Sequence, residues 1–210
     1  MDERKTSNYE MRTWLETIQN IVGSNGLKSI LNHANLRHYI DNFPPEDYDF
    51  VIPKKDIVNL FNSLNALFGE RGIRSLQLRI GREFTRVSIE KYNPMMARAL
   101  LTAAKIVPEN MKIRLALQRF REELGKALSL DIEIREDDQS FTVSIRGLFI
   151  SDGAKADTPI CYAYVGILES LMEWITGHLH EVHEVECVAT GHPADVFRIS
   201  KSHKNREKSS

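Results

Sequence analysis

The chain has only two cysteines, and it lacks several features that would assign a protein to a class at once. It contains no run of about 18 apolar residues, which a membrane-spanning helix would require. Its charged start, residues 1–5, is not followed by the apolar stretch of a signal peptide. Lys and Arg number 28 against 29 Asp and Glu, so the net charge of −1 creates no field that would attract nucleic acid. We therefore expect a cytoplasmic protein with no membrane span, no nucleic-acid partner and reduced thiols.

The familiar catalytic motifs are also missing from the sequence. It contains no P-loop, no dinucleotide-binding glycine fingerprint, no nucleophile elbow and no metalloprotease helix. The glycine-bearing segments 23–26 and 69–72 lack the preceding strand that a phosphate-binding loop needs, and they are typical of breaks between helices. We therefore expect a protein that is not an enzyme.

Apolar residues at helical spacing predict helices over most of the first 124 residues. A helical pair is expected over 9–42, followed by a proline-containing connector that ends near Pro53. Gly81, inside the later helical stretch, predicts a close approach of another helix. The neighbouring Arg82 has two open interpretations, contact with a ligand carboxylate or an ordinary surface ion pair.

Strand patterns replace helical ones in the second half of the chain. Apolar and polar residues alternate over 130–135 and 141–145, which predicts a hairpin, and a second hairpin with its turn at 190–193 follows the helix after Cys161. This order predicts an α+β fold with helices packed on one face of a four-stranded antiparallel sheet. The expected divisions are an N-terminal helical extension and linker (1–52), a ligand-binding domain (53–200) and a disordered basic tail (201–210).

The two cysteines belong to a pattern that could bind metal. Cys161 and Cys187 are 26 residues apart, with Glu184 three residues before Cys187 and Asp195 eight residues after it. Zinc accepts thiolate and carboxylate ligands, and a site with four protein ligands is usually structural. The alternative is that both cysteines are small buried apolar groups without a metal.

Residues 157–199, which include this pattern, resemble the 4-vinyl reductase domain family. The similarity lies in the segment 158–161, the small-residue helix after it, and the segments 184–191 and 195–199. In zinc-binding members, such as the sensor domains of phenol-responsive activators, the ligands are a helix-start Cys, a Glu-x-x-Cys and a Cys eight residues later. The resemblance implies a zinc site in which Asp195 replaces the last Cys, a harder ligand that should weaken binding of soft metals. His183 and His192 are possible substitutes for Asp195.

This ligand set requires an irregular strand. Residues three apart on a regular strand point to opposite faces of the sheet, so Glu184 and Cys187 can converge only through a bulge. We expect that bulge near Val185 and Glu186.

The resemblance also implies a function. Family members look like the small subunits of the TRAPP membrane-trafficking complex, and both groups tend to form homodimers and hold apolar molecules between helices. We therefore expect a homodimeric binding or sensing module with a hydrophobic or aromatic ligand, a chamber braced by zinc, and a downstream signalling partner. The candidate wall residues, each of which could instead be ordinary core, are Phe84, Met95, Met96, Phe120, Tyr162 and Tyr164.

Two other functions remain open at this stage. The family name points to a tetrapyrrole carrier or accessory factor in (bacterio)chlorophyll metabolism, although no nicotinamide or flavin motif is recognisable. Alternatively, the chain is a ligand-free interaction subunit that docks through its helices at 14–36. Two of the three histidines His178, His180 and His183 could bind a cation, or all three could be solvated residues of a polar loop.

Overall fold

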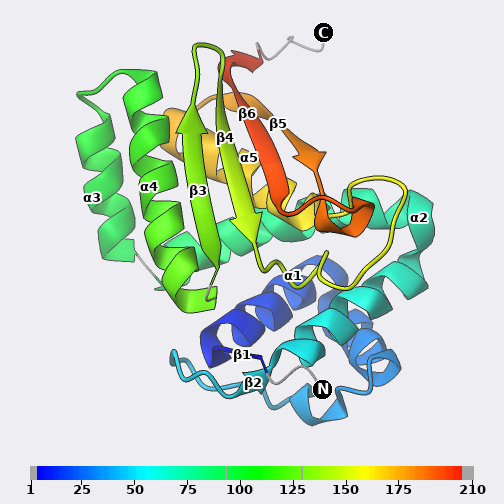
Figure 1. The fold of residues 1–210 in the computed structure, drawn as a ribbon. Coiled ribbons are helices and arrows are strands. Elements are labelled where there is room, and N and C mark those ends of the chain that lie inside the picture. The colour runs from blue at the N-terminus through cyan, green and yellow to red at the C-terminus, as the bar shows by residue number, and fades with distance from the viewer. Residues whose placement is uncertain (1–3, 93, 129, 205–210) are drawn as a thin grey trace, which may run out of the picture.

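Two hairpins form a four-stranded antiparallel sheet in the computed structural model, which describes residues 4–92, 94–128 and 130–204 (Figure 1). Strands β3 (Asp131–Glu136) and β4 (Ser140–Arg146) form the first hairpin, and β5 (Leu179–Glu186) and β6 (Asp195–Lys204) form the second. The sheet order is β3-β4-β6-β5. Helices lie against this sheet, so the predicted α+β class is confirmed.

The helices also follow the predicted pattern. They are α1 (Asn8–His33), α2 (Lys54–Val87), α3 (Pro94–Ala104), α4 (Glu109–Leu128) and α5 (Tyr162–Thr176). Shorter elements are β1 (Lys5–Thr6), β2 (Ile52–Pro53), the 3-10 turns η1 (Arg37–Tyr39) and η3 (Val188–Thr190), and the π-helical turn η2 (Ser88–Tyr92). Gly23 and Gly69 have positive φ and kink α1 and α2 at two expected breaks. None of the described helices is long and apolar enough to cross a membrane.

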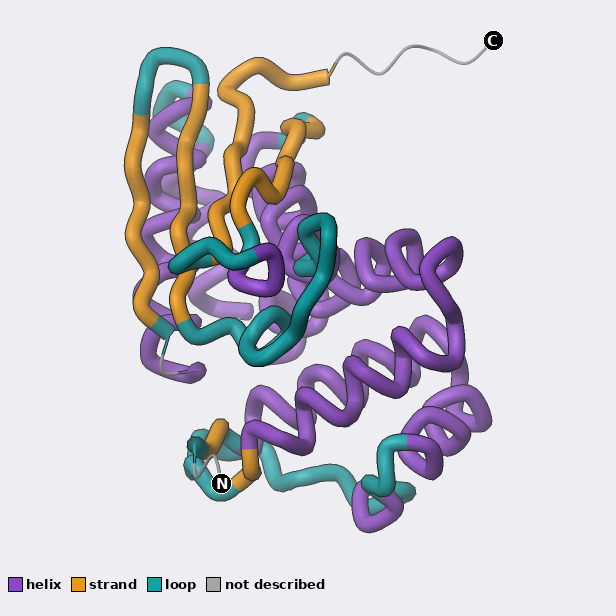
Figure 2. Tube along the Cα trace, turned by 45° about the vertical axis from the view of Figure 1, so that its right-hand side comes forward, coloured by secondary structure: helices purple, strands orange, loops and turns teal. Residues whose placement is uncertain are grey.

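The N-terminal helices cover the core of the protein. Figures 1 and 2 show α1 and the first part of α2 together beyond one end of the sheet. The Trp14 ring lies 5.0 Å from Phe61, 4.2 Å from Phe84 and 6.1 Å from Phe149, measured between ring centroids. The apolar stripe of α1 is thus buried internally and is not a free docking surface. The core is continuous across the expected boundary at residue 52.

The predicted start of the basic tail, residue 201, lies within the last strand. β6 continues to Lys204, where it pairs with Leu179 at the start of β5. The prediction of disorder for 201–204 is therefore wrong, because the strand pairing continues past the last alternating apolar residue, Ile199. Residues 205–210 lie outside the described part of the chain.

Helices α2 and α5 approach each other closely through two glycines. A Cβ on Gly81 would overlap the carbonyl oxygen of Ala163, and a Cβ on Gly166 would overlap that of Leu78. This confirms the close contact predicted at Gly81. The neighbouring Arg82 pairs with Glu169 of α5 at 2.7 Å, which is the surface ion pair rather than a ligand contact.

Replacing Gly81 with Ala should therefore force α2 and α5 apart. We expect a loss of about 3 kcal/mol or more in the free energy of unfolding, because a backbone carbonyl cannot move aside as a side chain can. Gly72→Ala is the matched control in the same helix, where the new Cβ would meet only Phe68 Cβ at 3.7 Å. It should gain about 0.5–1 kcal/mol. Urea unfolding of both variants tests this, and similar stabilities for the two would contradict it.

Glu10 of α1 is a buried carboxyl group in the same core. It is 1% exposed, accepts a hydrogen bond from the Thr6 hydroxyl, and has no hydrogen-bond partner at Oε1 among the described residues. Burial raises the pKa of Glu10 from its ordinary 4.5 to about 7. The folded protein therefore keeps a proton that the unfolded chain has already lost above pH 4.5.

The contribution of Glu10 to the stability of the protein should fall as pH rises from about 4.5 to 7, since this group binds more protons in the folded state in that window. The shift corresponds to about 3 kcal/mol at most. Glu10→Gln removes this cost, so its melting temperature relative to wild type should be several degrees more favourable at pH 8 than at pH 5. Glu122→Gln, at a side chain on α4 that is 49% exposed, is the control. Equal differences at the two pH values for Glu10→Gln would contradict the account.

Candidate functional site

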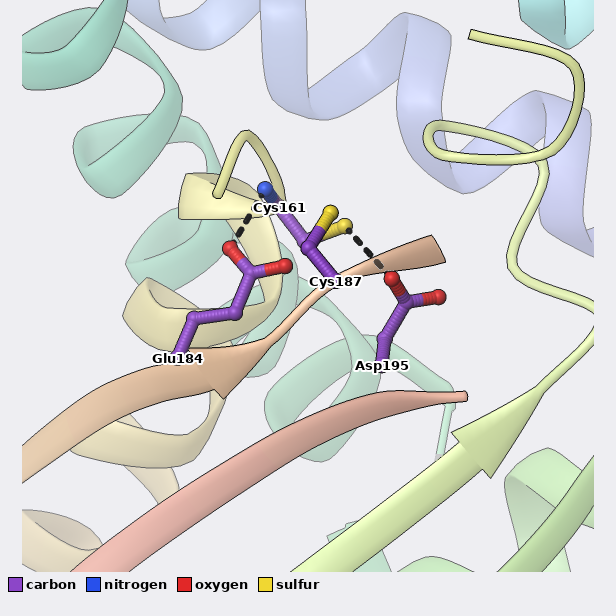
Figure 3. Close-up of side chains that lie close together, drawn as sticks. All are labelled: Cys161, Glu184, Cys187 and Asp195. Carbon is purple, nitrogen blue, oxygen red and sulfur yellow. Dashed lines mark hydrogen bonds between the residues drawn. The ribbon is translucent and has the colours of Figure 1, made fainter. Parts of the chain in front are cut away.

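The four predicted metal ligands converge at one end of β5 and β6 (Figure 3). Cys161 immediately precedes α5, Glu184 lies on β5, Cys187 follows β5, and Asp195 begins β6. One ligand atom from each residue lies within 4.8 Å of the other three. Both cysteines and Asp195 are fully buried, and both cysteines are free thiols. The two carboxylates lie on either side of the two sulfur atoms.

A strand irregularity brings Glu184 and Cys187 to the same side. Glu184 pairs with Phe197, and Glu186 pairs with the very next residue, Val196, so one residue of β5 has no partner in the register. That residue, Val185, is 42% exposed and points away from the core. The predicted bulge is confirmed at the predicted position.

Hydrogen bonds hold the two carboxylates toward the cysteines. The Cys161 N–H donates to Glu184 Oε2 at 2.8 Å, and Cys161 Sγ lies 3.6 Å from Asp195 Oδ1. Asp195 also accepts from the Val188 N–H at 2.9 Å and from the Ser151 hydroxyl at 2.6 Å. Asp195 therefore points into the cluster. The suggested substitutes lie elsewhere, with His183 beside Glu181 and His192 beside Glu186.

Hydrogen bonding between the two thiols and burial of the two carboxylates perturb the pKa values of all four acidic groups. A hydrogen bond from Cys161 lowers the pKa of Cys187 to about 4. The same hydrogen bond, together with burial, raises the pKa of Cys161 well above its ordinary value. Burial raises the pKa of Glu184 to about 8 and that of Asp195 to about 6. One thiolate forms readily here, and the other three groups resist ionisation.

The cluster fits a structural zinc ion. Two sulfur and two carboxylate donors can complete a tetrahedron without an open position. Glu184 Oε1 is buried and has no hydrogen-bond partner among the described residues, so it is available as a ligand. A divalent cation would also offset the repulsion among the acidic groups. Metal binding itself stays a prediction.

Replacing Cys187 with Ser should remove one equivalent of zinc per chain. We expect the zinc-loaded variant to melt several degrees below wild type, because the metal joins α5 to the second hairpin. Metal content and melting curves check this, and zinc-depleted samples of both proteins serve as controls for the packing effect of the substitution. A variant that keeps both the metal and the melting temperature would eliminate the structural zinc site.

An apolar cavity lies near the other end of α5. Its volume is about 110 Å³, and residues of α2, η2, α3, α4 and α5 form its walls. Most of the lining atoms are apolar, and the larger apolar side chains are Phe84, Ile89, Leu100, Phe120, Leu124, Leu128, Ile167, Leu171 and Trp174. Tyr9 and Tyr48 also line it and stack on each other with ring centroids 4.9 Å apart. Because Tyr48 is 53% exposed, this part of the wall faces solvent.

The structure places two of the six expected chamber residues on this cavity, Phe84 and Phe120. Met95 is 85% exposed at the start of α3. Tyr162 lies beneath the guanidinium of Arg74, and Tyr164 is buried against Phe197 of the sheet. The predictions of Met95, Tyr162 and Tyr164 as wall residues are therefore wrong for this cavity. The side chain of Met96 lies outside the described part of the protein.

Some of the wall residues that the sequence analysis missed could have been identified from the sequence, and others could not. Ile167, Leu171 and Trp174 have the i, i+4, i+7 spacing of one helix face, which could have identified them. Tyr48 comes from the connector before β2, where no periodicity exists. Its contribution depends on the path of a loop.

Comparison with known proteins gives one family match. Residues 141–201 match the V4R domain, a segment that runs from β4 to β6 and contains all four residues of the cysteine cluster. The resemblance to the 4-vinyl reductase domain is confirmed over this segment. No curated protein matches the chain.

Several solved structures share the fold. The phenol-responsive sensory domain of the transcription activator PoxR with phenol has a TM-score of 0.53 and 15% identity, covering 72% of this chain and 76% of that chain. An H-NOX protein from S. oneidensis in the Fe(II)NO ligation state has a TM-score of 0.58 and 10% identity over 92% and 99% of the two chains. An unliganded Fe(II) H-NOX protein from K. algicida has a TM-score of 0.59 and 12% identity over 95% and 98%. The H-NOX coverage extends to most of the N-terminal helices.

Proposed function

We propose that the chain is a small-molecule binding or sensing module whose cavity holds an apolar compound the size of one aromatic ring. The observation that carries this proposal is the apolar cavity of about 110 Å³ among α2, α3, α4 and α5. An engineered apolar cavity of about 150 Å³ binds benzene, so the present cavity is of single-ring size. The likeness to a sensory domain seen with phenol supports the same ligand class.

The composition of the wall supports an aromatic ligand with little polarity. Phe84 and Phe120 offer ring faces and edges, which favour offset or edge-on contact with another ring. Two polar neighbours of these rings on the wall are already engaged, since the Thr85 hydroxyl donates to the Ile167 carbonyl at 3.1 Å and Arg119 forms ion pairs with Glu122 and Glu123. Discrimination between ligands would thus come mainly from shape and size.

The cavity size favours a single ring over a tetrapyrrole. A similar H-NOX structure is in the Fe(II)NO ligation state and another concerns heme distortion, and the family name made a tetrapyrrole an alternative for this chain. Pockets for drug-sized ligands have volumes of about 300–1,000 Å³, several times the present volume. A tetrapyrrole would require α3 or α4 to move outward. Visible absorbance of the purified protein would reveal one.

The zinc site is proposed as a brace for this module. It would join the start of α5 to the second hairpin, while the later turns of α5 line the cavity. Zinc with four protein ligands serves stability, and its binding energy contributes to folding. The homodimer and the downstream signalling partner remain predictions that accompany this function.

Filling the cavity should abolish ligand binding without unfolding the protein. Ala116 of α4 is 2% exposed and lines the cavity, so in Ala116→Leu the larger side chain would occupy the ligand volume. We expect phenol or toluene at 100 times its Kd to stabilise wild type by about 2.7 kcal/mol and to leave this variant unchanged.

The control for this experiment is Ala66→Leu, which makes the same substitution at an exposed position of α2. It should respond to phenol or toluene as wild type does in thermal unfolding. Equal ligand stabilisation of Ala116→Leu and wild type would contradict the assignment of the cavity. A wild-type protein that responds to neither compound would contradict the ligand class.

A further inference from the structure

A second cluster of potential metal ligands lies at the end of β5 and β6 away from the cysteines. It consists of Glu109, the first residue of α4, His178 between α5 and β5, His180 on β5 and His203 on β6. The strand register pairs His180 with His203, while the cysteine cluster adjoins the last pairs of the same ladder, near Glu186 and Val196. Three elements far apart in sequence thus bring a carboxylate and three imidazoles together.

The distances from the Glu109 carboxylate to the three histidines suit a small cation. Glu109 Oε2 lies 3.0 Å from His178 Nδ1, and Glu109 Oε1 lies 3.2 Å from His180 Nε2 and 3.3 Å from His203 Nδ1. Two ligands of a tetrahedral ion with bonds of about 2.0–2.1 Å are separated by about 3.3 Å, the edge of the tetrahedron. Glu109 Oε1 is buried and makes no hydrogen bond within the described structure, although two imidazole nitrogens are near it.

His180 provides the strongest indication that an ion binds at this cluster. Its side chain is fully buried, and Nδ1 lies 2.8 Å from the carbonyl oxygen of Ser200, so Nδ1 carries the hydrogen and donates it. The other nitrogen, Nε2, lies 3.2 Å from Glu109 Oε1 and has no hydrogen-bond partner among the described residues, so in the neutral ring its lone pair is available to an ion. Metal-binding histidines usually donate their second ring N–H to a carbonyl or carboxylate in this way.

The two exposed histidines complete the arrangement. The rings of His178 and His203 stack with centroids 4.3 Å apart, and one ligand atom each from Glu109, His178 and His203 lie within 4.8 Å of one another. Their side chains are 47% and 40% exposed, which leaves a path for an ion from solvent. His183, the third histidine of the crowded segment, is 71% exposed beside Glu181 and takes no part.

We propose that Glu109, His178 and His203, with His180 Nε2 held against the Glu109 carboxylate beside them, form a second metal site, separate from the cysteine cluster, for a divalent transition metal ion such as zinc. Imidazole nitrogens favour zinc, copper, nickel and iron over calcium and magnesium. The ion would tie the start of α4, whose later turns line the cavity, to the paired ends of β5 and β6. The proposal does not depend on the ligand in the cavity.

Cobalt titration of the untagged full chain tests this site separately from the cysteine cluster. Cobalt bound by thiolates gives an intense charge-transfer absorption in the near ultraviolet, whereas imidazole and carboxylate ligands give only weak visible bands. We expect wild type to bind two cobalt ions per chain, one of each spectral type. Cys187→Ser should lose the charge-transfer band and keep the other site.

The exposed positions of His178 and His203 allow a double substitution that preserves the fold. His178→Ala/His203→Ala should weaken the second cobalt site at least about tenfold and leave the charge-transfer band unchanged. Glu109→Gln should also weaken the second cobalt site. His183→Ala, at an exposed position of β5, should behave as wild type. Unchanged affinity and stoichiometry in the double variant would overturn the proposal. A wild-type protein that binds cobalt only through thiolates, or not at all, would overturn it too.

Discussion

The close packing of α5 against α2 is the constraint on which the rest of the structure depends. Gly81 and Gly166 allow each helix to rest directly on a carbonyl of the other, so the position of α5 is fixed with little freedom. The start of α5 places Cys161 beside Glu184, Cys187 and Asp195, and its later turns place Ile167 and Leu171 on the cavity wall. One helix contact thus positions both the cysteine cluster and the proposed ligand chamber.

The charges of the cysteine cluster favour the binding of a dication. Four acidic groups converge where three of them are fully buried, and burial raises the pKa values of Glu184 and Asp195. Such an arrangement is costly for a metal-free protein and favourable for one that binds a dication. The His and Glu cluster at the other end of β5 and β6 instead surrounds one carboxylate with imidazole donors. Both clusters would join helices to the same pair of strands, at opposite ends.

Much of the fold could be predicted from local pattern, and much of the cavity could not. Alternation predicted the first hairpin, the turn at 190–193 marked the second, and the spacing of Glu184 and Cys187 required a bulge that the structure contains. The close helix contact followed from Gly81. Tyr48 and Met95 show the limit, because a connector's path and the outward face of a short helix depend on tertiary packing. His178 and His180 were named with His183 as a group of which two could bind a cation, but their partners Glu109 and His203 come from elements that only the fold brings near.

A crystal structure of the zinc-loaded protein soaked with phenol, with anomalous data at the zinc edge, tests the central claim most directly. The account predicts ring-shaped density between Phe84 and Phe120 and an anomalous peak among Cys161, Glu184, Cys187 and Asp195. A cavity that remains without phenol would contradict the proposed function. The absence of an anomalous peak at the cysteine cluster would contradict the zinc brace.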